Sequence, residues 1–549
     1  MQELVFDVAI VGYGPVGAIA ANFLGSYGIK TVVFERETRP YHLPRAIGFN
    51  HEIMRIFQQL GLEQEIASVV TTVDGVEFLD RSHQVMWSVE FERTCLSDGF
   101  SPNYVFYQPD LEAKLRAGVE RFEEVTVHLG HDVTRIEQHQ QNVTVEVRDL
   151  VRDVVYQTKV KYVLGCDGAR SITRQLAGLQ LHDFGFHQRQ LVVDALLTEK
   201  VDLPTKVQQL CDTRRPGVFV HSTNNHRRWE FVLEQQETAA EMEQPEKVKQ
   251  LLADYWLDPS QLKIIRAVVY SFHSLIALQW RNDRIFIVGD AAHQMPPILG
   301  QGMCSGIRDA QNICWKLNFV LRGLAADKLL DSYQTERLAH VKEIVKTATR
   351  AFKIFKTRNP LIALVRNTVL RLIQRFGNPK KLQNIGSDMP PLRQGILQSP
   401  SQKLSAIGQM FIQPQVLSEN GLVLLDTILG RGWAIVGLDL DWLNDLSPEA
   451  KVLQTYLSIK LVCVVTTLNS DLPTPYPVKK IADPSSLIKD WLAKYNQEIV
   501  IIRPDRYVFG TCNPSELNST LAQLQSLLIG DRILPEEQLS TAMATQAFS

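Results

Sequence analysis

The sequence lacks three features that would each define a class of protein. No stretch of eighteen uninterrupted apolar residues occurs in the 549-residue chain, so we expect no membrane-spanning helix. The seven cysteines are scattered, with no C-x-x-C pair and no metal-ligand spacing, so we expect reduced thiols in a cytoplasmic protein and no metal site. The start, MQELVFDVAIVG, has no basic region before its apolar run, which is not the pattern of a signal peptide.

The chain also lacks a strong charge of either sign. Its net charge of −2 gives no electrostatic case for binding nucleic acid or an acidic membrane. The apolar fraction of 45% and the charged fraction of 21% are those of globular proteins, and the length exceeds what one hydrophobic core supports. We therefore expect two to four globular domains.

What is present begins with a glycine-rich turn, VGYGPVG. Its Gly12, Gly14 and Gly17 fit the spacing G-x-G-x-x-G, inside a strand–helix–strand unit expected over residues 7–34. The first glycine permits a tight turn, the second lets backbone approach a pyrophosphate, and the third lets helix and strand pack closely. Glu35 follows eighteen residues after Gly17 and can accept hydrogen bonds from ribose hydroxyls. The unit therefore predicts an adenine-dinucleotide site.

Two later motifs place single acids at strand ends. GCDGARS carries Asp167 between small residues, as suits backbone packed against a cofactor, although an ordinary Asp-Gly turn explains it equally well. RIFIVGDAAHQMPPILGQGMCSG places Asp290 at the end of a strand, where ligands of α/β sheets collect. The bare amides at Gly300 to Met303 begin a helix, and the positive end of its dipole would stabilise the negative charge of a reduced flavin.

The remaining patterns outline the rest of the fold. Helices are expected at 50–69, at 110–122 with Asp110 as its cap, from Gly302 to about 323, and over 327–357. Alternating runs over 125–164 predict an antiparallel ribbon, and 181–280 reads as a β-rich insert. Prolines and polar residues at 379–403 predict a linker before a separate small α/β domain. Cys463 is expected in the core of that domain and Cys512 at its surface.

The three motifs, in this order and spacing, resemble those of the class A flavoprotein aromatic hydroxylases. Further stretches resemble the 3-(3-hydroxyphenyl)propionate and 3-hydroxycinnamate hydroxylases of that family: YHLPRAIGFNHEIMRIF, HRRWEFVL, LGQGMCSGIRDAQNICWKL, DSYQTERLAHV, MFIQPQV, ENGLVLLD and IIRPDRYVFG. The resemblance implies an α/β fold with a Rossmann-like FAD-binding domain (1–180 and 281–345). It also implies an inserted β-rich substrate domain like that of p-hydroxybenzoate hydroxylase (181–280), a helical segment and linker (346–403), and a thioredoxin-like C-terminal domain (404–549).

The resemblance also assigns a cofactor site. FAD would be held by Gly12, Gly14, Pro15, Val16, Gly17, Glu35, Arg36, Arg45, Gln108, Asp167, Gly289, Asp290, Pro297, Gly300, Gln301, Gly302 and Met303. The resemblance further implies that NADH, or NADPH, binds transiently without a dinucleotide fold of its own, which is consistent with the single G-x-G-x-x-G of this sequence. In the family the reduced flavin reacts with O₂ to give a C4a-hydroperoxide, which hydroxylates the ring of a phenolic acid ortho to its hydroxyl.

The substrate side of the site is less defined by the sequence. A base that takes the phenol proton assists ring attack, and His221, Tyr270 and His273 are the candidates. Arg214, Arg215 or Arg228 would meet a substrate carboxylate. A quinolone or polyketide ring as substrate, and a non-catalytic flavin-binding interaction protein, are the alternative interpretations. A homodimer is possible, and the C-terminal domain, without C-x-x-C, is expected to pack rather than to exchange disulfides.

Overall fold

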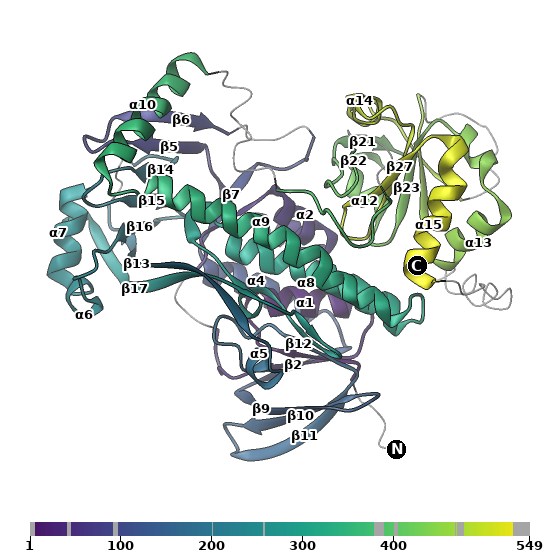
Figure 1. Cartoon of the computed structure of the whole chain (residues 1–549), viewed down its shortest axis with the longest axis horizontal. Helices are drawn as coiled ribbons and strands as arrows, with labels where there is room; N and C mark the ends of the chain where they lie inside the picture. Colours follow the sequence, from purple (N-terminus) through teal and green to yellow (C-terminus); the bar gives the residue numbers. More distant parts are fainter. Residues whose placement is uncertain are drawn as a thin grey trace. The chain divides into compact units, whose positions relative to one another are not determined.

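The computed structural model divides into two compact units (Figure 1). It describes residues 6–40, 45–91, 97–199, 201, 203–255, 258–377, 389–399, 405–466, 468 and 477–530. The first unit comprises residues 1–93, 101–310 and 341–389, and the second comprises residues 94–100, 311–340 and 390–549. The four segments expected from the sequence are finer than this division and stay predictions. Only 389–399 of the expected linker lies within the described residues.

The first unit is built on a six-stranded sheet with the order β18-β19-β12-β1-β2-β8. Its members are β1 (Val8–Val11), β2 (Thr31–Glu35), β8 (Val125–Leu129), β12 (Tyr162–Gly165), β18 (Arg281–Asn282) and β19 (Ile285–Ile287). All neighbours pair in parallel except β18 and β19. Helix α1 (Pro15–Ser26) connects β1 to β2 as the glycine motif predicts, and Gly28 follows it with φ +68°. This arrangement confirms the Rossmann-like prediction.

The ribbon expected over 125–164 is only partly correct. Its middle forms a three-stranded antiparallel sheet of β9 (His131–Gln138), β10 (Val143–Asp149) and β11 (Val154–Val160). Its two ends, β8 and β12, belong to the parallel sheet instead. An edge strand of a parallel sheet is half exposed, so the polar and apolar residues of β8 alternate as they would in a ribbon.

The β-rich insert is confirmed as part of an eight-stranded sheet with the order β20-β17-β13-β16-β15-β14-β5-β6. Its strands are β5 (Gly75–Leu79), β6 (Val85–Glu90), β13 (Leu181–Leu197), β14 (Val207–Leu210), β15 (Gly217–His221), β16 (His226–Val232), β17 (Leu262–Ala277) and β20 (His293–Gln294). Apolar residues of α6 (Ala239–Met242) and α7 (Pro245–Tyr255) join its core beside Trp229 and Phe231. The sheet contains more strands than the expected insert at 181–280 supplies, because β5 and β6 come from residues 75–90.

The helices of the first unit correct two expectations. The helix expected at 50–69 is two helices, α2 (His51–Gln59) and α3 (Glu63–Ala67), separated by Gly61 with φ +66°. Helix α4 (Gln108–Val119) begins two residues before Asp110, which lies in its first turn and is not its cap, because Pro109 suits the start of a helix. The other elements are β3 (Gly48–Asn50), β4 (Val70–Thr72), β7 (Asn103–Phe106), α5 (Ile172–Leu176) and α10 (Pro360–Phe376).

Two long helices carry the chain between the units, α8 (Gln301–Leu321) and α9 (Asp331–Phe355). The second unit contains a sheet with the order β25-β24-β23-β26-β27. Its elements are β21 (Gln415–Ser418), β22 (Gly421–Leu424), α12 (Leu425–Leu429), β23 (Ala434–Leu438), α13 (Pro448–Tyr456), β24 (Lys460–Val464), β25 (Lys479–Ile481), α14 (Leu487–Lys494), β26 (Ile499–Ile502), β27 (Val508–Cys512) and α15 (Leu517–Ile529). β23 and β24 run parallel while β26 and β27 run antiparallel, which is the thioredoxin-like arrangement.

The burial of the cysteines depends on how these sheets pack. Cys463 is buried in the second unit, as expected, but Cys512 is buried as well, so the expectation of an exposed Cys512 is wrong. The last residue of β27 points into the sheet's core because that strand is covered along nearly its whole length. Within the described ranges, no helix combines the length and the apolar character that crossing a membrane requires.

Candidate active site

The glycine turn between β1 and α1 forms a backbone cradle. Gly12 has φ +96°, and a Cβ there would lie 2.7 Å from the carbonyl oxygen of Cys166. A Cβ on Gly17 would lie 2.1 Å from the oxygen of Gly12, so both glycines are required by packing. A Cβ on Gly14 would meet nothing within 4 Å. The middle glycine therefore leaves its side of the cradle open, and Pro15 begins the helix behind it, as a pyrophosphate site requires.

Glu35 is fixed beside this turn. Its Oε2 accepts a hydrogen bond from the amide of Tyr13 at 2.7 Å, and its Oε1 accepts one from the amide of Glu37 at 2.9 Å. Arg116 donates to the carbonyl oxygen of Tyr13 at 2.7 Å and so holds the same turn from the other side. Arg36 is exposed and pairs with Glu37 at 3.3 Å. The position of Glu35 at the end of β2 suits a ribose, and the acid retains accepting capacity for one.

The loop after β19 packs tightly against α1 and α8. Gly289 has φ +64°, and a Cβ there would lie 3.1 Å from Cγ2 of Val16; a Cβ on Gly306 would lie 2.7 Å from the same atom. Asp309 accepts a hydrogen bond from Nε2 of His293 at 2.6 Å and one from the amide of Gly289 at 3.2 Å. Gly306 and Asp309 were not predicted as site residues, although both lie in the LGQGMCSGIRDAQNICWKL stretch.

Asp290 lies in the short 3-10 turn that follows β19. Its side chain is accessible to solvent, yet desolvation raises the pKa of its carboxyl, while the charges of His293 and Arg45 act in the opposite direction. The electrostatic influence of Arg45 on Asp290 means that the loop of Arg45 and the loop after β19 lie near each other.

The start of α8 presents backbone amides to this region. Pro297 begins a 3-10 turn, Gly300 ends it with φ +63°, and a Cβ on Gly302 would meet nothing within 4 Å. Gln301 is buried and accepts a hydrogen bond from Arg308 at 3.0 Å, so its backbone, rather than its side chain, is available to a ligand. The unfilled amides at the start of a 21-residue helix suit a negative charge. Next to them Met303 is half-buried.

Two predicted cofactor residues hold backbone in place. Oε1 of Gln108 accepts hydrogen bonds from the amides of Arg45 at 2.7 Å and Ala46 at 2.6 Å, which fixes the loop that carries Arg45. Asp167 accepts a hydrogen bond from Oγ of Ser171 at 2.5 Å and one from the amide of Thr173 at 2.8 Å, and burial raises the pKa of its carboxyl. Direct contacts of Gln108 and Asp167 with a cofactor stay predictions. The open cradle, Glu35, Asp290 and the α8 amides together fit FAD.

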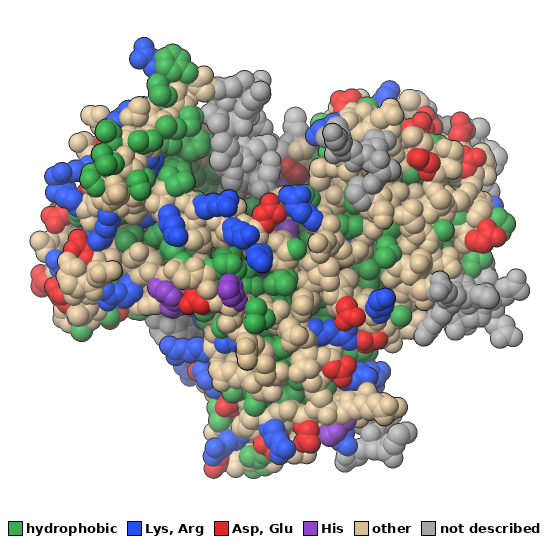
Figure 2. Space-filling model, viewed as in Figure 1, with side chains coloured by type: hydrophobic (Ala, Val, Ile, Leu, Met, Phe, Trp, Pro, Cys, Tyr) green, Lys and Arg blue, Asp and Glu red, His purple; other side chains and the backbone are tan. Residues whose placement is uncertain are grey.

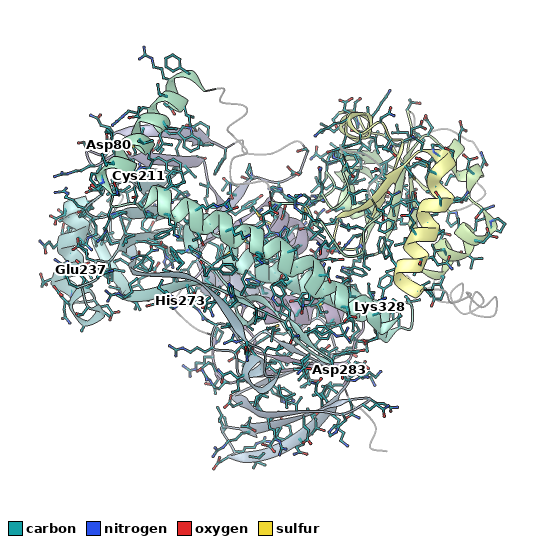
Figure 3. All side chains as sticks on the ribbon, in the orientation of Figure 1. Asp80, Cys211, Glu237, His273, Asp283 and Lys328 are labelled. Carbon is teal, nitrogen blue, oxygen red and sulfur yellow. The ribbon has the colours of Figure 1, made fainter. Side chains whose placement is uncertain are left out.

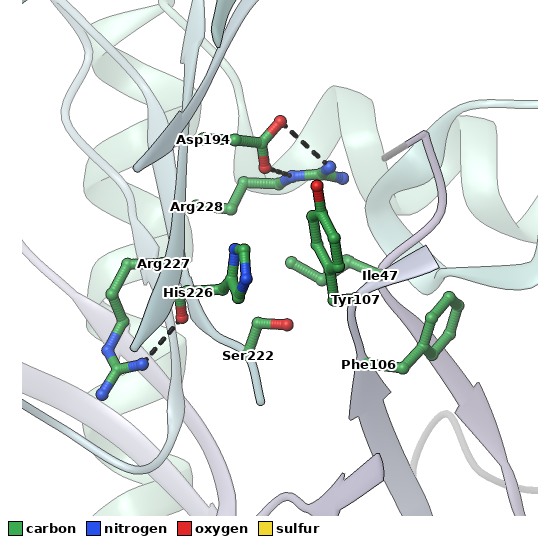
Figure 4. A pocket seen from close by; sticks show the side chains of 8 residues that line it. All are labelled: Ile47, Phe106, Tyr107, Asp194, Ser222, His226, Arg227 and Arg228. Atoms are coloured by element: carbon green, nitrogen blue, oxygen red, sulfur yellow. Dashed lines mark hydrogen bonds and ion pairs between the residues drawn. The ribbon is translucent and has the colours of Figure 1, made fainter. Parts of the chain in front are cut away.

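A small pocket lies at one end of this region (Figure 4). It is lined by Ile47, Phe106, Tyr107, Asp194, Ser222, His226, Arg227 and Arg228. The ring of Tyr107 stacks on that of His226, with ring centres 4.0 Å apart. Ile47 precedes Gly48, whose carbonyl oxygen lies 3.9 Å from Sγ of Cys304 in the first turn of α8. The pocket therefore adjoins the start of α8.

Two lining residues, Asp194 and Arg228, form a buried charge cluster with Arg266, which lies behind them, and we call these three residues the pocket cluster. Nε of Arg228 lies 2.8 Å from Oδ1 of Asp194, and Nη2 of Arg266 lies 2.6 Å from Oδ2. Arg228 also donates to the carbonyl oxygen of Arg45 at 2.9 Å. Burial raises the pKa of the neighbouring Glu230 and so disfavours its charged form. Within the cluster itself, one carboxylate serves two guanidinium groups.

The pocket also contains polar groups with spare hydrogen-bonding capacity. Within the described ranges, Oγ of Ser222 and Nε of Arg227 are buried and have no hydrogen-bond partner. Burial lowers the pKa of His226, which favours its neutral form and leaves one ring nitrogen as a proton acceptor. Unsatisfied buried donors and acceptors are costly, so their presence at a pocket points to a ligand that satisfies them.

The residues predicted for the substrate side lie elsewhere, with one exception. His221 is buried at the end of β15, Tyr270 accepts a hydrogen bond from Arg266 at 2.8 Å, and Nδ1 of His273 lies 2.7 Å from Nδ1 of His187 in an exposed part of the eight-stranded sheet (Figure 3). None of the three lines the pocket. Their predicted catalytic role stays untested. His226 was missed, although it begins the quoted HRRWEFVL stretch.

The three arginines predicted to bind a substrate carboxylate lie in different surroundings. Arg214 is exposed beside Asp212, with Nη2 and Oδ2 3.5 Å apart, and Arg215 pairs with Glu237 at 2.5 Å. Only Arg228 lines the pocket, and there it is already paired with Asp194. The assignment of a substrate carboxylate to these arginines stays a prediction.

Comparison with known proteins covers nearly the whole chain. A family model described as FAD binding domain matches residues 5–348, and one described as HcaD C-terminal domain matches residues 408–527. A probable NADH-specific resorcinol 4-hydroxylase of Rhodococcus jostii (strain RHA1) is 35% identical over 508 residues, 92% of this chain and 91% of the relative. A 3-(3-hydroxy-phenyl)propionate/3-hydroxycinnamic acid hydroxylase of Klebsiella pneumoniae (strain 342) is 31% identical over 547 residues, 97% of both chains.

Solved structures share the fold at lower identity. The flavin-dependent monooxygenase PieE, in complex with FAD and substrate, aligns with a TM-score of 0.81 at 20% identity, covering 96% of this chain and 99% of PieE. Aklavinone-11 hydroxylase, with FAD and aklavinone, aligns with a TM-score of 0.77 at 19% identity, covering 95% of this chain and 99% of that one.

Proposed function

This chain belongs to the FAD-binding-domain family of flavoprotein aromatic hydroxylases, and from that membership we propose that it uses FAD, NADH and O₂ to hydroxylate a meta-substituted phenol ortho to its hydroxyl. Resorcinol and 3-(3-hydroxyphenyl)propionate, which appear in the names of its relatives, are both meta-substituted phenols. NADH is the co-substrate named for the Rhodococcus relative.

The observation that carries the proposal is the pocket beside the start of α8. It combines a neutral His226, the buried hydroxyl of Ser222 and the spare Nε–H of Arg227. Those groups match what a phenol presents, namely one acidic O–H and a ring that tolerates apolar walls. Ile47 and Phe106 supply such walls, and the stacked Tyr107 stiffens the position of His226.

FAD, when bound, supplies the reducing and oxygen-activating chemistry, and the protein residues do the rest. His226 is proposed to accept the phenol proton at its free ring nitrogen, which makes the ring more electron-rich. Ser222 and Arg227 would hold the ring oxygen, and the two guanidinium groups of the pocket cluster would favour its anionic form. The apolar walls limit the access of water, which keeps the reaction directed at the ring.

The names of the relatives favour a small substrate. Relatives named for resorcinol and for 3-(3-hydroxy-phenyl)propionate are 35% and 31% identical to this chain, whereas the solved aklavinone-11 hydroxylase is 19% identical. A single substituted ring is therefore better supported than the quinolone or polyketide alternative.

The test is NADH oxidation by the FAD-loaded protein with resorcinol, with 3-(3-hydroxyphenyl)propionate and with its 4-hydroxy isomer as the matched control. The proposal requires faster NADH oxidation with a meta-substituted phenol, together with an equal amount of ortho-hydroxylated product found by mass spectrometry. Faster oxidation that yields only H₂O₂ would reject the substrate class but not the enzyme class. If no aromatic compound has any effect, a non-catalytic flavin-binding role is favoured.

Localisation and assembly extend the proposal. The absence of disulfide-type cysteine spacing supports a cytoplasmic enzyme, and the six described cysteines are all buried and form no disulfide. We propose a homodimer as well, by analogy of fold alone, and sedimentation of the FAD-loaded protein distinguishes it from a monomer.

A further inference from the structure

Helix α10 exposes an unusually apolar face. Its exposed large side chains are Leu361 (73%), Ile362 (49%), Leu364 (65%), Val365 (64%), Val369 (45%), Leu372 (51%) and Phe376 (73%). The spacing 361, 365, 369, 372 and 376 aligns most of them along one stripe of the helix. Figure 2 shows this apolar surface over α10. Contiguous apolar patches of this kind mark protein or membrane interaction sites.

The inner face of α10 is firmly anchored, so the exposure is not the result of a frayed helix. Leu370 packs in a core cluster with Phe78 and Trp87 of the sheet. Arg366 donates to the carbonyl oxygen of Cys211 at 2.7 Å, and Arg371 pairs with Asp80 at 2.7 Å. Figure 3 labels Asp80 and Cys211 beside this helix. The outer stripe is therefore presented in a fixed orientation.

A basic stripe precedes the apolar one. Lys342, Lys346, Arg350 and Lys353 are exposed at a spacing of four, four and three, so they share one face of α9. Among the described residues, none of them takes part in an ion pair shorter than 4.0 Å. The sequence has no Asp or Glu at all from 344 to 387. Lys and Arg side chains along α9 and the apolar cover of α10 occur together on the face seen in Figure 2.

We propose that this face, the apolar stripe of α10 with the basic stripe of α9, docks the enzyme on the surface of an anionic lipid bilayer. Helix α10, 17 residues or about 26 Å long, would lie in the interface with its apolar stripe among the acyl chains, while α9 contacts the phosphate groups. An anionic bilayer matches both stripes, because its acyl chains accept the apolar stripe and its phosphate groups attract the basic stripe. A second copy of this chain matches the apolar stripe only, because a two-fold contact would oppose one basic stripe with the other.

The net charge of −2 does not reveal this surface, because acidic residues elsewhere in the chain balance the basic stripe. Docking of this kind involves no spanning helix. Such a location would suit an enzyme whose phenolic substrates partition into membranes, and the docking itself does not depend on which phenol is hydroxylated.

The experiment is co-sedimentation of the full-length, FAD-loaded protein with vesicles of phosphatidylcholine and phosphatidylglycerol in equal parts, and with phosphatidylcholine alone. We expect binding to the anionic vesicles that weakens as salt is added. The variant Lys346→Gln/Arg350→Gln/Lys353→Gln should bind about a hundredfold more weakly, from roughly fivefold per charge. The variant Leu361→Asn/Val365→Asn/Leu372→Asn should lose binding at every salt concentration, with hydroxylase activity in solution unchanged.

The control variants use exposed residues of the same types elsewhere in the chain. Val151→Asn/Val155→Asn removes two exposed valines from the β10–β11 ribbon, and Lys263→Gln/Lys489→Gln removes two exposed lysines, and both should bind as the wild type does. The proposal is overturned if the wild type ignores anionic vesicles, or if the controls weaken binding equally. It is also overturned if sedimentation shows a dimer that the Leu361→Asn/Val365→Asn/Leu372→Asn variant converts to a monomer, since α10 would then be a self-interface.

Discussion

Two buried charge clusters in this molecule are built differently. In the second unit, Arg503 pairs with Glu336 and Asp505, both at 2.7 Å, and Lys316 pairs with Glu336 at 2.7 Å. We call these four residues the closed cluster; they contain two cations and two anions, and none is more than 1% exposed. The pocket cluster instead has one carboxylate for two guanidinium groups and stands beside unsatisfied polar atoms.

The difference between the two clusters indicates that the closed cluster stabilises the fold, whereas the pocket cluster is placed to act on a ligand. Every charge of the closed cluster has its partner inside the protein, and Trp315 and Asn312 add hydrogen bonds to Asp505. A cluster of this kind has nothing to offer a ligand, and removing one member leaves an uncompensated buried charge. The pocket cluster instead lies beside two pocket-lining atoms without a partner in the described part of the chain, Oγ of Ser222 and Nε of Arg227, and a bound ligand would satisfy them.

The largest expected effect is on the closed cluster. Replacing Arg503 by Met leaves two carboxylates near one lysine, and we expect the second unit to lose roughly 3–5 kcal/mol of unfolding free energy. Urea unfolding followed by tryptophan fluorescence measures it. The matched change in the pocket cluster, Arg266→Met, leaves the Arg228–Asp194 pair intact and should cost clearly less. Equal losses in the two variants would contradict the distinction between the clusters.

The next effect concerns the proposed base. His226→Gln keeps a polar side chain but removes the proton acceptor, and kcat with the phenol should fall about a hundredfold. The control is His221→Gln, which removes the other histidine of the β15–β16 hairpin; burial lowers its pKa too, but it does not line the pocket. Steady-state kinetics with product analysis compares them. A similar fall in both variants would show that His226 acts through the fold of the hairpin rather than on the substrate.

A smaller effect is expected for the hydroxyl of Ser222. Ser222→Ala removes one hydrogen bond to the ring oxygen, so KM should rise about five- to tenfold, which corresponds to about 1 kcal/mol, with FAD affinity unchanged. Thr223→Ala is the control, because the neighbouring Thr223 hydroxyl is also buried and without a partner in the described part of the chain, yet lies outside the pocket. If Thr223→Ala raises KM as much as Ser222→Ala does, Ser222 has no specific role.

The smallest effect is the order in which acid affects the two units. Burial lowers the pKa of His221 and His226 below 6.5, so the unfolded first unit binds protons that the folded one does not, and its stability should decline as pH falls below about 6.5. Burial alone would raise the pKa of Glu336, but Arg503 and Lys316 hold it well below 4.5. The contribution of Glu336 to the second unit is therefore present above pH 4.5 and lost only as pH falls toward that lowered value.

Urea midpoints measured from pH 7.5 to pH 4 follow both transitions. The first unit should weaken earlier, and the double variant His221→Gln/His226→Gln should remove part of that early decline. An earlier decline of the second unit would contradict the assignment.

Particular residues show which features of the site could be predicted from the sequence. The turn at Gly12, Gly14 and Gly17, the strand end at Asp290 and the helix start at Gly302 are each specified within a few neighbouring residues, and all were located correctly as backbone features. Asp309 and Gly306 were not predicted, because a buried acid and a close helix contact look like any helical residues until the packing against Val16 and His293 is known.

The pocket could not be predicted from residues that are neighbours along the chain. Tyr107 and His226 stack although 119 positions separate them in the sequence, and Ile47 joins them from a third segment. Nothing near His226 in the sequence distinguishes it from His221 or His273, so the sequence could not show which of these histidines lines the pocket, and the catalytic role of His221, Tyr270 and His273 stays a prediction. Likewise, the recruitment of β5 and β6 into the sheet depends on a pairing with β14 that no sequence period reveals.

By itself, the sequence determined the two folds and the FAD cradle, because backbone turns, helix starts and strand periods depend on residues that are neighbours along the chain. The tertiary structure alone decided which histidine faces the pocket, which arginines share Asp194 and which helix face is left bare. Those properties depend on distances between segments far apart in sequence, and burial and charge act through such distances.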